Sequence, residues 1–291
     1  MSAAIYAARQ KSDFLLVTME FGGQMAKKEV AIENYPGLPE ISAQDLIAKF
    51  GQHLKKLNVA VEIAEVLRVD KIEGGFAVAA GKKTFRARAL IIATGSMPRM
   101  LDIPGEKEFL GRGVGYCATC DGPLFSRREV AVAGGGNSAF EAALFLAKFA
   151  KKVYILERGP RVIADAANQE LARKTGNVEI VLNARVLRVE GENFVKAAIY
   201  QDINGEEISL PVEGVFIKAG YRPAAEIAAG LARLNDRGEI EFDCKTHQTA
   251  IEGLFVAGDV SEVKFKQIVV AAGEGAKAAM AAGEYLRKLQ S

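Results

Sequence analysis

Two cysteines separated by two residues are the first feature of the chain that could do chemistry. They are Cys117 and Cys120, in the stretch "GYCATCDG". A Cys-x-x-Cys pair can supply half of a zinc site, or it can form a thiol–disulfide redox pair. The short spacer allows a small disulfide ring, and a helix that follows the pair would lower a thiol pKa through its positive end. Asp121 comes next, and its carboxylate could handle a proton as the disulfide opens, or simply cap a turn.

A zinc site would need two more ligands. The remaining candidates are Cys244, His53 and His247, and only Cys244 and His247 lie near one another in the sequence. Three cysteines in 291 residues are too few for a disulfide framework, and they fit a reducing, intracellular compartment. We therefore favour the redox pair, predict no metal site, and expect Cys244 to be a packed residue.

Composition narrows the class of protein. The formal net charge is +2 and charged residues make up 25% of the chain, which gives no reason to expect a nucleic acid or a membrane surface as partner. No apolar run approaches the roughly 18 residues of a membrane span. Arg9 and Lys11 interrupt the N-terminal apolar stretch, so no signal peptide is expected. These observations predict a globular cytoplasmic protein.

A glycine turn follows a strand-like stretch and opens a helix. Gly134, Gly136 and Ala139 give the pattern G-x-G-x-x-A inside residues 129–158, which read as strand, turn, helix and returning strand. Glycines let the backbone approach a pyrophosphate, and the helix N-terminus supplies unpaired N–H groups. The pattern predicts a dinucleotide site, which also includes Asn137 and Ser138 at the start of the helix.

The returning strand ends at Glu157, twenty-one residues after the second glycine of the pattern. A carboxylate at this place would accept hydrogen bonds from the ribose hydroxyls and would repel a 2′-phosphate. Arg158 and Arg161 lie close by and act in the opposite sense. We predict NADH as the nicotinamide cofactor, with NADPH as the alternative, and include Arg158 in the site.

Strands and helices alternate along the chain, which favours α/β layers. Asn204-Gly205 predicts a hairpin turn, and the stretches 97–113 and 220–226 resemble linkers because of their glycines, prolines and mixed charges. The predicted elements are a helix over 3–9, a strand over 14–19, a helix from Leu46 to Leu57, strands over 59–96, the unit 129–158, strands to about residue 219, a strand in 253–260 and a closing helix over 266–289.

The stretches "ATCDGPLF", "VAVAGGGNSAFEAALFLAKFAKKVYILER", "GLFVAGDV" and "KQIVVAAGEGAKAA" together resemble the low-molecular-weight thioredoxin reductase family over essentially the whole chain. The resemblance implies a homodimeric FAD flavoprotein with two doubly wound dinucleotide-binding domains, the nicotinamide domain being inserted into the FAD domain. It divides the chain into an FAD-binding first part over 1–102, an NAD(P)H-binding domain with the redox cysteines over 103–222, and an FAD-binding second part over 223–291.

The same resemblance implies a route for electrons. They would pass from NAD(P)H through FAD to Cys117–Cys120, and then to a protein disulfide such as a thioredoxin or glutaredoxin-like partner. Cys120 would be the thiol on the flavin side, and Cys117 would attack the partner. The FAD-lining residues, with Asp259 on the ribityl chain, would be Gly22, Gly23, Gln24, Asn34, Thr94, Gly95, Gly258, Asp259, Lys266, Gln267 and Ile268.

The chain departs from the family pattern in two places. Members that bind NADPH place a His-Arg-Arg run where this chain has "LERGPRVIAD", and this stretch is closer to the NADH-dependent flavoprotein subunit of alkyl hydroperoxide reductase. Members also begin with a strand and a G-x-G-x-x-G turn before a helix that resembles "SAAIYAARQ". We therefore expect the chain as given to bind FAD weakly and to be poorly stable, and expect an upstream strand in the gene.

Three functions remain open from the sequence. The first is a thioredoxin reductase-like flavoprotein, and the second is an NADH-dependent reductase of a peroxiredoxin system that uses a separate carrier protein. The third is a flavin-poor, inactive dinucleotide-binding scaffold.

Overall fold

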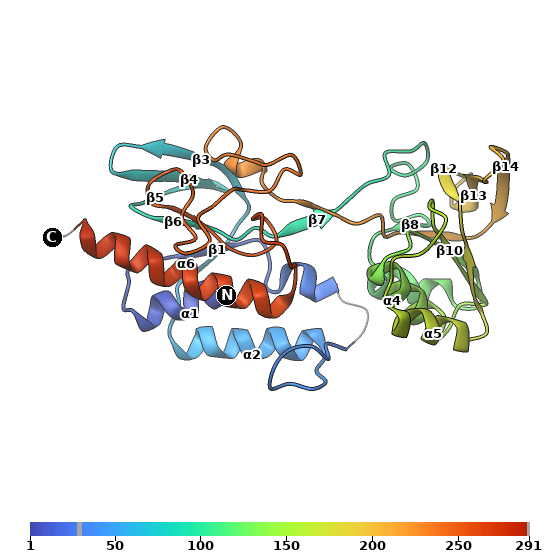
Figure 1. The fold of residues 1–291 in the computed structure, drawn as a ribbon, viewed down its shortest axis with the longest axis horizontal. Helices are drawn as coiled ribbons and strands as arrows, with labels where there is room; N and C mark the ends of the chain where they lie inside the picture. The colour runs from blue at the N-terminus through green and yellow to red at the C-terminus, as the bar shows by residue number, and fades with distance from the viewer. Residues whose placement is uncertain (28–30, 290–291) are drawn as a thin grey trace. The chain divides into compact units, whose positions relative to one another are not determined.

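The computed structural model describes residues 1–27 and 31–289, which form two compact units (Figure 1). The middle unit contains Pro98–Tyr221. The terminal unit contains Met1–Ala26, Ala31–Met97 and the part of the chain from Arg222 onward. No helix in the described ranges is both long and apolar enough to cross a membrane.

A parallel five-stranded sheet forms the centre of the middle unit. Strand β9 lies in the middle of the sheet because its side chains are apolar on both faces, and Val130, Ala131 and Val132 are fully buried. The strands follow the order β11-β10-β9-β15-β8. Their bounds are Val114–Gly115 for β8, Glu129–Ala133 for β9, Lys152–Leu156 for β10, Val178–Val181 for β11 and Gly214–Ile217 for β15.

Successive residues of β9 point to opposite faces of this sheet and pack against different layers. Val130 and Val132 pack against Phe140 on the helical side, where α4 (Asn137–Leu146) and α5 (Ala166–Lys174) lie. Ala131 packs against Val189 on the other side. That layer is an antiparallel sheet of β12 (Arg185–Gly191), β13 (Val195–Gln201) and β14 (Glu207–Pro211).

The terminal unit repeats this layering around shorter parallel strands. Strands β6 (Leu90–Ile92) and β17 (Leu254–Val256) pair in parallel, as do β1 (Leu16–Thr18) and β2 (Val61–Ile63). Within the described residues each of these is a separate two-stranded sheet. In the middle unit, by comparison, β9 lies at the centre of one continuous five-stranded sheet and leads into the glycine turn.

The two faces of the β6–β17 pair are again different. Phe255 packs against Ala278 and Ala282 of the long helix α6 (Ile268–Lys288). Its neighbours Leu254 and Val256 pack against Phe76 on the opposite side. This side is an antiparallel sheet of β3 (Val66–Ile72), β4 (Gly75–Ala80) and β5 (Lys83–Ala87).

Two further helices complete the terminal unit. Helix α1 (Ser2–Arg9) packs against α6, and the two are seen together in Figure 1. Gly275 permits the close approach, since a Cβ there would lie 3.1 Å from the backbone N of Ala3. Helix α2 (Ala43–Lys56) begins after Ser42, whose hydroxyl accepts the N–H of Asp45 at 3.0 Å.

Several predictions about the fold are confirmed. The architecture is α/β with parallel sheets, residues 129–158 form β9, α4 and β10, and the closing helix is α6. Asn204-Gly205 joins the antiparallel strands β13 and β14, with Gly205 at a φ of +85°. The short strands β7 (Ser96–Pro98) and β16 (Tyr221–Pro223), which carry the chain from one unit to the other, pair with each other.

Two predictions are wrong. Strands do not continue without interruption to residue 219, because α5 intervenes; it buries only Ala172, and so it leaves little apolar periodicity in the sequence. The stretch 97–113 is for the most part a packed segment and not a linker. Its residues Glu106 and Phe109 are 1% and 3% exposed. Gly105 has a φ of +84°, and a Cβ there would also clash with the carbonyl oxygen of Val189.

The glycine turn after β9 yields a stability prediction. Gly134 has a φ of +132°, and a Cβ there would lie 2.3 Å from the carbonyl oxygen of Lys218. Gly176 has a φ of +78° with nothing within 4 Å, so it is a control for a glycine at positive φ that has no steric neighbour. We expect Gly134→Ala to lower the free energy of unfolding by about 1–3 kcal/mol more than Gly176→Ala. Urea unfolding followed by circular dichroism measures this, and equal effects would contradict the proposed steric restriction.

Candidate functional site

Cys117 and Cys120 form a disulfide, which confirms the redox pair over the zinc alternative. Cys117 precedes the short helix α3 (Ala118–Asp121), and its sulfur accepts the N–H of Cys120 at 3.1 Å. Cys117 is half-buried and Cys120 is exposed. Across residues 1–27 and 31–289, no group of three or more His, Cys, Asp or Glu side chains is arranged to hold a metal ion.

Asp121 lies against the backbone beside the disulfide. Its Oδ2 atom would be 2.8 Å from a Cβ built on Gly115, so the glycine leaves room for the carboxylate. Tyr116, which precedes Cys117, donates its hydroxyl to Glu106 at 2.6 Å. Burial, followed by the hydrogen bond to this carboxylate, raises the pKa of Tyr116, so the phenol remains a proton donor. This contact anchors the chain leading into the disulfide, and no local pattern in the sequence signals it.

The predicted dinucleotide turn is open on the side where a ligand would lie. Gly136 begins α4 without a side-chain cap, which leaves the first N–H groups of the helix available. Ala139, within the first turn of α4, is fully buried, which permits close packing of the helix. Asn137 already uses its amide, donating to Asp165 at 2.8 Å, whereas Ser138 stays partly accessible.

Glu157 is held against this turn. Its Oε1 accepts the N–H of Gly159 at 2.7 Å, and its Oε2 would lie 2.4 Å from a Cβ on Gly135. Only glycine at position 135 therefore leaves room for the carboxylate of Glu157. Arg158 and Arg161 are exposed.

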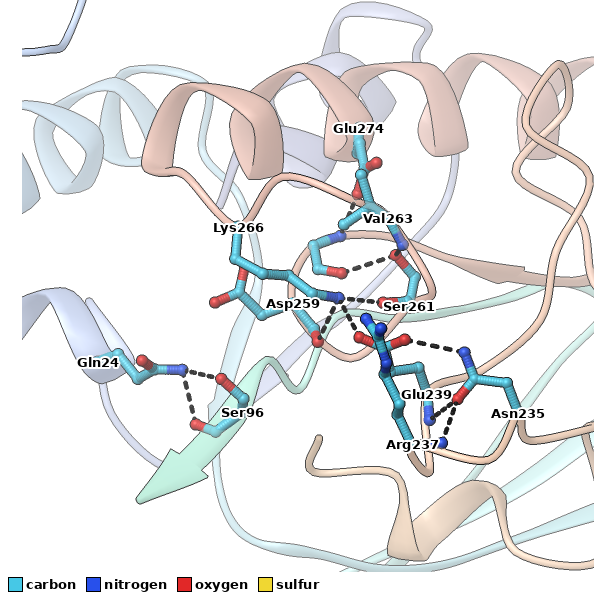
Figure 2. Close-up of polar contacts among 11 residues, drawn as sticks. Gln24, Ser96, Asn235, Arg237, Glu239, Asp259, Ser261, Val263, Lys266 and Glu274 are labelled. Atoms are coloured by element: carbon cyan, nitrogen blue, oxygen red, sulfur yellow. Dashed lines mark hydrogen bonds and ion pairs between the residues drawn. The ribbon is translucent and has the colours of Figure 1, made fainter. Parts of the chain in front are cut away.

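In the terminal unit, three segments far apart in the sequence converge. Gln24 donates to the carbonyl oxygen of Ser96 at 2.7 Å and to its hydroxyl at 2.5 Å, as Figure 2 shows. Ser96 also hydrogen-bonds Asp259. Burial raises the pKa of Asp259, while Lys266 and the bond with Ser96 act against this. The predicted residues of three segments thus lie around one place. They are Gly22, Gly23 and Gln24, then Thr94 and Gly95, and then Gly258 and Asp259.

Two of these glycines, Gly23 and Gly95, border open space, whereas Gly22 packs against Ile47 and Gly258 against Ala271. A Cβ on Gly23 would meet nothing within 4 Å, and one on Gly95 would reach only the amide of Gln24, at 4.0 Å. Thr94 uses its hydroxyl internally, donating to the carbonyl oxygen of Ala224 at 2.6 Å. Asn34 donates to the side chain of Gln267 at 3.0 Å, which joins two more predicted residues. Ile268 begins α6 and packs with the apolar cluster around Ile32.

The side chain of Lys266 bonds other residues of the site. Its ammonium bonds the carbonyl oxygens of Ser261 and Asp259 and lies 2.9 Å from the carboxylate of Glu239 (Figure 2). These contacts hold the turn after Asp259, and the cofactor contact that the resemblance implies for Lys266 stays a prediction.

Two residues of this place were not predicted from the sequence. Ser96 links Gln24 to Asp259, and its position directly after Gly95 was a signal that could have been used. Glu274 descends from α6 onto the turn, and its carboxylate accepts the N–H of Gly258 at 2.7 Å (Figure 2). No local pattern marks it, since the contact depends on how α6 packs.

One further expectation is wrong. Cys244 was predicted to be packed, but it is a free and exposed thiol. It lies in the turn that begins at Asp243, whose carboxylate accepts the N–H groups of Lys245 and Thr246. Local backbone bonding, and not burial of the side chain, therefore fixes this segment.

Comparison with known proteins relates this geometry to a family. The model of the pyridine nucleotide-disulphide oxidoreductase family matches residues 1–275. Thioredoxin reductase of Bacillus subtilis (strain 168) is 36% identical over 293 residues, covering 100% of this chain and 92% of that protein. An alkyl hydroperoxide reductase subunit of Escherichia coli (strain K12) is 38% identical over 292 residues, covering 98% of this chain. The chain spans only 56% of the length of that protein.

Solved structures of thioredoxin reductases are similar to this chain. The crystal structure of Lactococcus lactis thioredoxin reductase in its FR conformation superposes with a TM-score of 0.94 at 34% identity, covering 99% of this chain and 95% of that one. Thioredoxin reductase of T. acidophilum gives 0.90 at 33% identity, covering 99% and 94%.

Glu274 generates a pH prediction. Burial raises its pKa above the ordinary value, and Lys266 and Lys277 only partly oppose this. The folded state then binds the proton more tightly than the unfolded state, so the contribution of Glu274 to stability falls as pH rises above about 4.3. Glu274→Gln keeps an acceptor for Gly258 without the charge. We expect it to gain stability relative to wild type between pH 4 and pH 7.5 in urea unfolding.

The control variant is Glu274→Ala, which leaves the N–H of Gly258 without its acceptor. It should be less stable than Glu274→Gln by about 1–3 kcal/mol at neutral pH. Equal stabilities of the two variants, or a Glu274→Gln difference that does not vary with pH, would argue against this role.

Proposed function

The chain belongs to the pyridine nucleotide-disulphide oxidoreductase family, in its thioredoxin reductase branch, and we propose that it passes two electrons from NAD(P)H, through FAD, to the Cys117–Cys120 disulfide. The resulting dithiol reduces a protein disulfide. The observation that carries this proposal is the disulfide itself, formed beside Asp121 in the same unit as the glycine turn.

The residues of the middle unit fit a nicotinamide dinucleotide. The uncapped N-terminus of α4 offers N–H donors to a pyrophosphate. Glu157 offers a fixed acceptor to ribose hydroxyls, since Gly159 holds one of its oxygens and Gly135 leaves space for the other. A 2′-phosphate would meet this carboxylate at close range, so we propose NADH as the preferred cofactor.

The residues of the terminal unit fit a flavin. Gly23 and Gly95 leave open space next to the polar groups of Gln24 and Asp259. When bound, NAD(P)H would supply a hydride and FAD would accept it, so that hydride transfer and disulfide reduction are separate steps. We propose that Asp259 accepts from the ribityl hydroxyls, which is supported by the contacts of Ser96 with its side chain and of Lys266 with its backbone carbonyl.

At the dithiol, the chain itself does the chemistry. One thiolate attacks a sulfur of the partner disulfide, forming a mixed disulfide, and the second thiol resolves it. We assign the attack to Cys117 and the flavin-side position to Cys120, with Asp121 as the group that takes up or returns a proton. Cys120 is the more exposed of the two in the oxidised protein.

For the partner we propose a small protein disulfide of the thioredoxin or glutaredoxin-like kind, reduced by a homodimer in the cytoplasm. The second candidate is a reductase of a peroxiredoxin system that uses a separate carrier. It is favoured by the identity to the alkyl hydroperoxide reductase protein of Escherichia coli, of which this chain matches only part. A coupled NADH assay with thioredoxin against such a carrier distinguishes the two.

The dithiol mechanism predicts the behaviour of single cysteine variants. Cys117→Ser and Cys120→Ser should each abolish the NADH-dependent reduction of thioredoxin, because each removes a partner of the exchange, while NADH should still bleach the flavin absorbance near 450 nm. Cys244→Ser is the control and should turn over nearly as fast as wild type. Normal turnover by either of the first two variants would refute the mechanism.

The roles of the two thiols are separable by trapping. If Cys117 attacks the partner, reduced Cys120→Ser protein should accumulate a mixed disulfide with oxidised thioredoxin, visible on a non-reducing gel after rapid alkylation of the freed thioredoxin thiol, because the variant itself has no second thiol to resolve it. Cys117→Ser protein should not. The reverse pattern would exchange the two assignments.

The cofactor preference rests on Glu157. We expect NADH to give the higher kcat/KM, and expect Glu157→Ala to weaken NADH by about 1–3 kcal/mol through loss of a charged hydrogen-bond acceptor. Steady-state kinetics with both nucleotides test this. A wild-type preference for NADPH would show that Arg158 and Arg161 decide the site.

A further inference from the structure

The residue before the redox pair is anchored on the face of the chain opposite to the pair. Val114 and Tyr116 pack into the apolar cluster on the antiparallel-sheet side of the middle unit. Gly115, between them, faces the carboxylate of Asp121, since a Cβ there would lie 2.8 Å from its Oδ2. This alternation is that of an extended strand, and Cys117 continues it with a φ of −117° and a ψ of 100°. Tyr116 therefore holds the chain from one side, and the sulfur of Cys117 extends toward the other.

The hydrogen-bond acceptor of Tyr116 is a buried carboxylate. Glu106 is 1% exposed. Its Oε1 accepts the hydroxyl of Tyr116 at 2.6 Å and the N–H of Leu101 at 3.0 Å, and its Oε2 accepts the N–H of Ile103 at 3.4 Å. A buried carboxylate that lost one of these donors would not regain water in its place, so the bond with Tyr116 is costly to break.

The turn that carries Glu106 is itself fixed to strand β12. The carbonyl oxygen of Pro104 accepts the N–H of Val189 at 3.0 Å. Gly105 lies so close to this strand that a Cβ would be 2.0 Å from the carbonyl oxygen of Val189. Because the carboxylate extends from a segment held in this way, its bond with Tyr116 fixes the position of the tyrosine.

The other cysteine is held from the side of α4. Gly122 follows α3 and packs closely on this side, since a Cβ there would lie 3.0 Å from Leu146 and 3.2 Å from Phe149. The N–H of Cys120 donates to the sulfur of Cys117 at 3.1 Å. The segment with Cys120 is thus anchored to α4, whereas the residue before Cys117 is anchored to Glu106.

We propose that Glu106 and Tyr116 are positioning residues of the redox pair. When the S–S bond opens, the covalent link between the two sulfurs is lost, and their hydrogen bond keeps Cys117 beside Cys120. This raises the effective concentration of each thiol toward the other. The disulfide is then favoured over the dithiol, which makes the dithiol a stronger reductant. The benefit for a partner disulfide rests on the proposed function, but the effect on the two thiols does not.

The equilibrium between the two redox forms measures this effect. The full chain is equilibrated anaerobically in mixtures of reduced and oxidised dithiothreitol. The protein disulfide takes two electrons and two protons from reduced dithiothreitol, whose own thiols close into a ring disulfide. Rapid alkylation and peptide mass spectrometry then give the fraction of Cys117 and Cys120 that is still joined, and Cys244 is counted on a separate peptide.

Tyr116→Phe keeps the ring and removes the hydroxyl. We expect it to lower the equilibrium constant for disulfide formation by about three- to tenfold, the size that one hydrogen bond can account for. Glu106→Gln keeps a carbonyl oxygen as acceptor for Tyr116, so we expect its constant to stay close to the wild-type value.

Tyr154→Phe is the matched control. The hydroxyl of Tyr154 also donates to a carboxylate, that of Glu129 at 3.0 Å, and its ring packs against the same apolar cluster. We expect this variant to leave the equilibrium constant unchanged, even where it lowers the free energy of unfolding.

A bond that only stabilises the fold would stabilise both redox forms equally. An unchanged constant in Tyr116→Phe would therefore overturn the proposal, as would an equal shift in Tyr154→Phe. A shift in Glu106→Gln as large as that in Tyr116→Phe would also overturn it, because charge and not anchoring would then be responsible. The measurement needs no nicotinamide, so it decides the positioning role whether or not the proposed electron route holds.

Discussion

Parallel strands that end in a glycine at positive φ are the constraint on which the rest of this structure depends. Gly134 follows β9, Gly95 follows β6 and Gly258 follows β17, with φ values of +132°, +72° and +79°. At such a residue the chain turns sharply away from the sheet, and the absence of a Cβ leaves room beside the backbone. The main polar groups assigned to the cofactors lie at or beside these turns, because the strands deliver them to the same edge of a sheet.

Buried charge then fixes the turns in the terminal unit. Glu274 accepts the N–H of Gly258, and Lys266 bonds the carbonyl oxygens of Asp259 and Ser261 while pairing with Glu239. Without these contacts the turn would hold Asp259 in many orientations. Ordering it would then cost part of the free energy of ligand binding.

The sequence was informative where one local pattern determines the structure, and uninformative where packing does. The Cys-x-x-Cys spacing led to a disulfide, and the glycines after β9 led to a turn with an uncapped helix start, because both depend on neighbouring residues. The sequence does not predict α5, because this helix buries only one residue. It predicts a linker over residues 97–113, because glycines that make turns inside this packed segment have the same sequence pattern as linker glycines. Glu274 and the exposed Cys244 could not be found at all, because the first acts across the fold and the second depends on the Asp243 turn.

The central claim is that electrons from the nicotinamide reach Cys117–Cys120, and counting thiols tests it most directly. Protein loaded with FAD is titrated anaerobically with NADH, alkylated and analysed by peptide mass spectrometry. The account predicts that alkylation rises from one cysteine per chain, Cys244, to three, with Cys117 and Cys120 labelled together. A flavin that is fully bleached while Cys117 and Cys120 remain joined would contradict it.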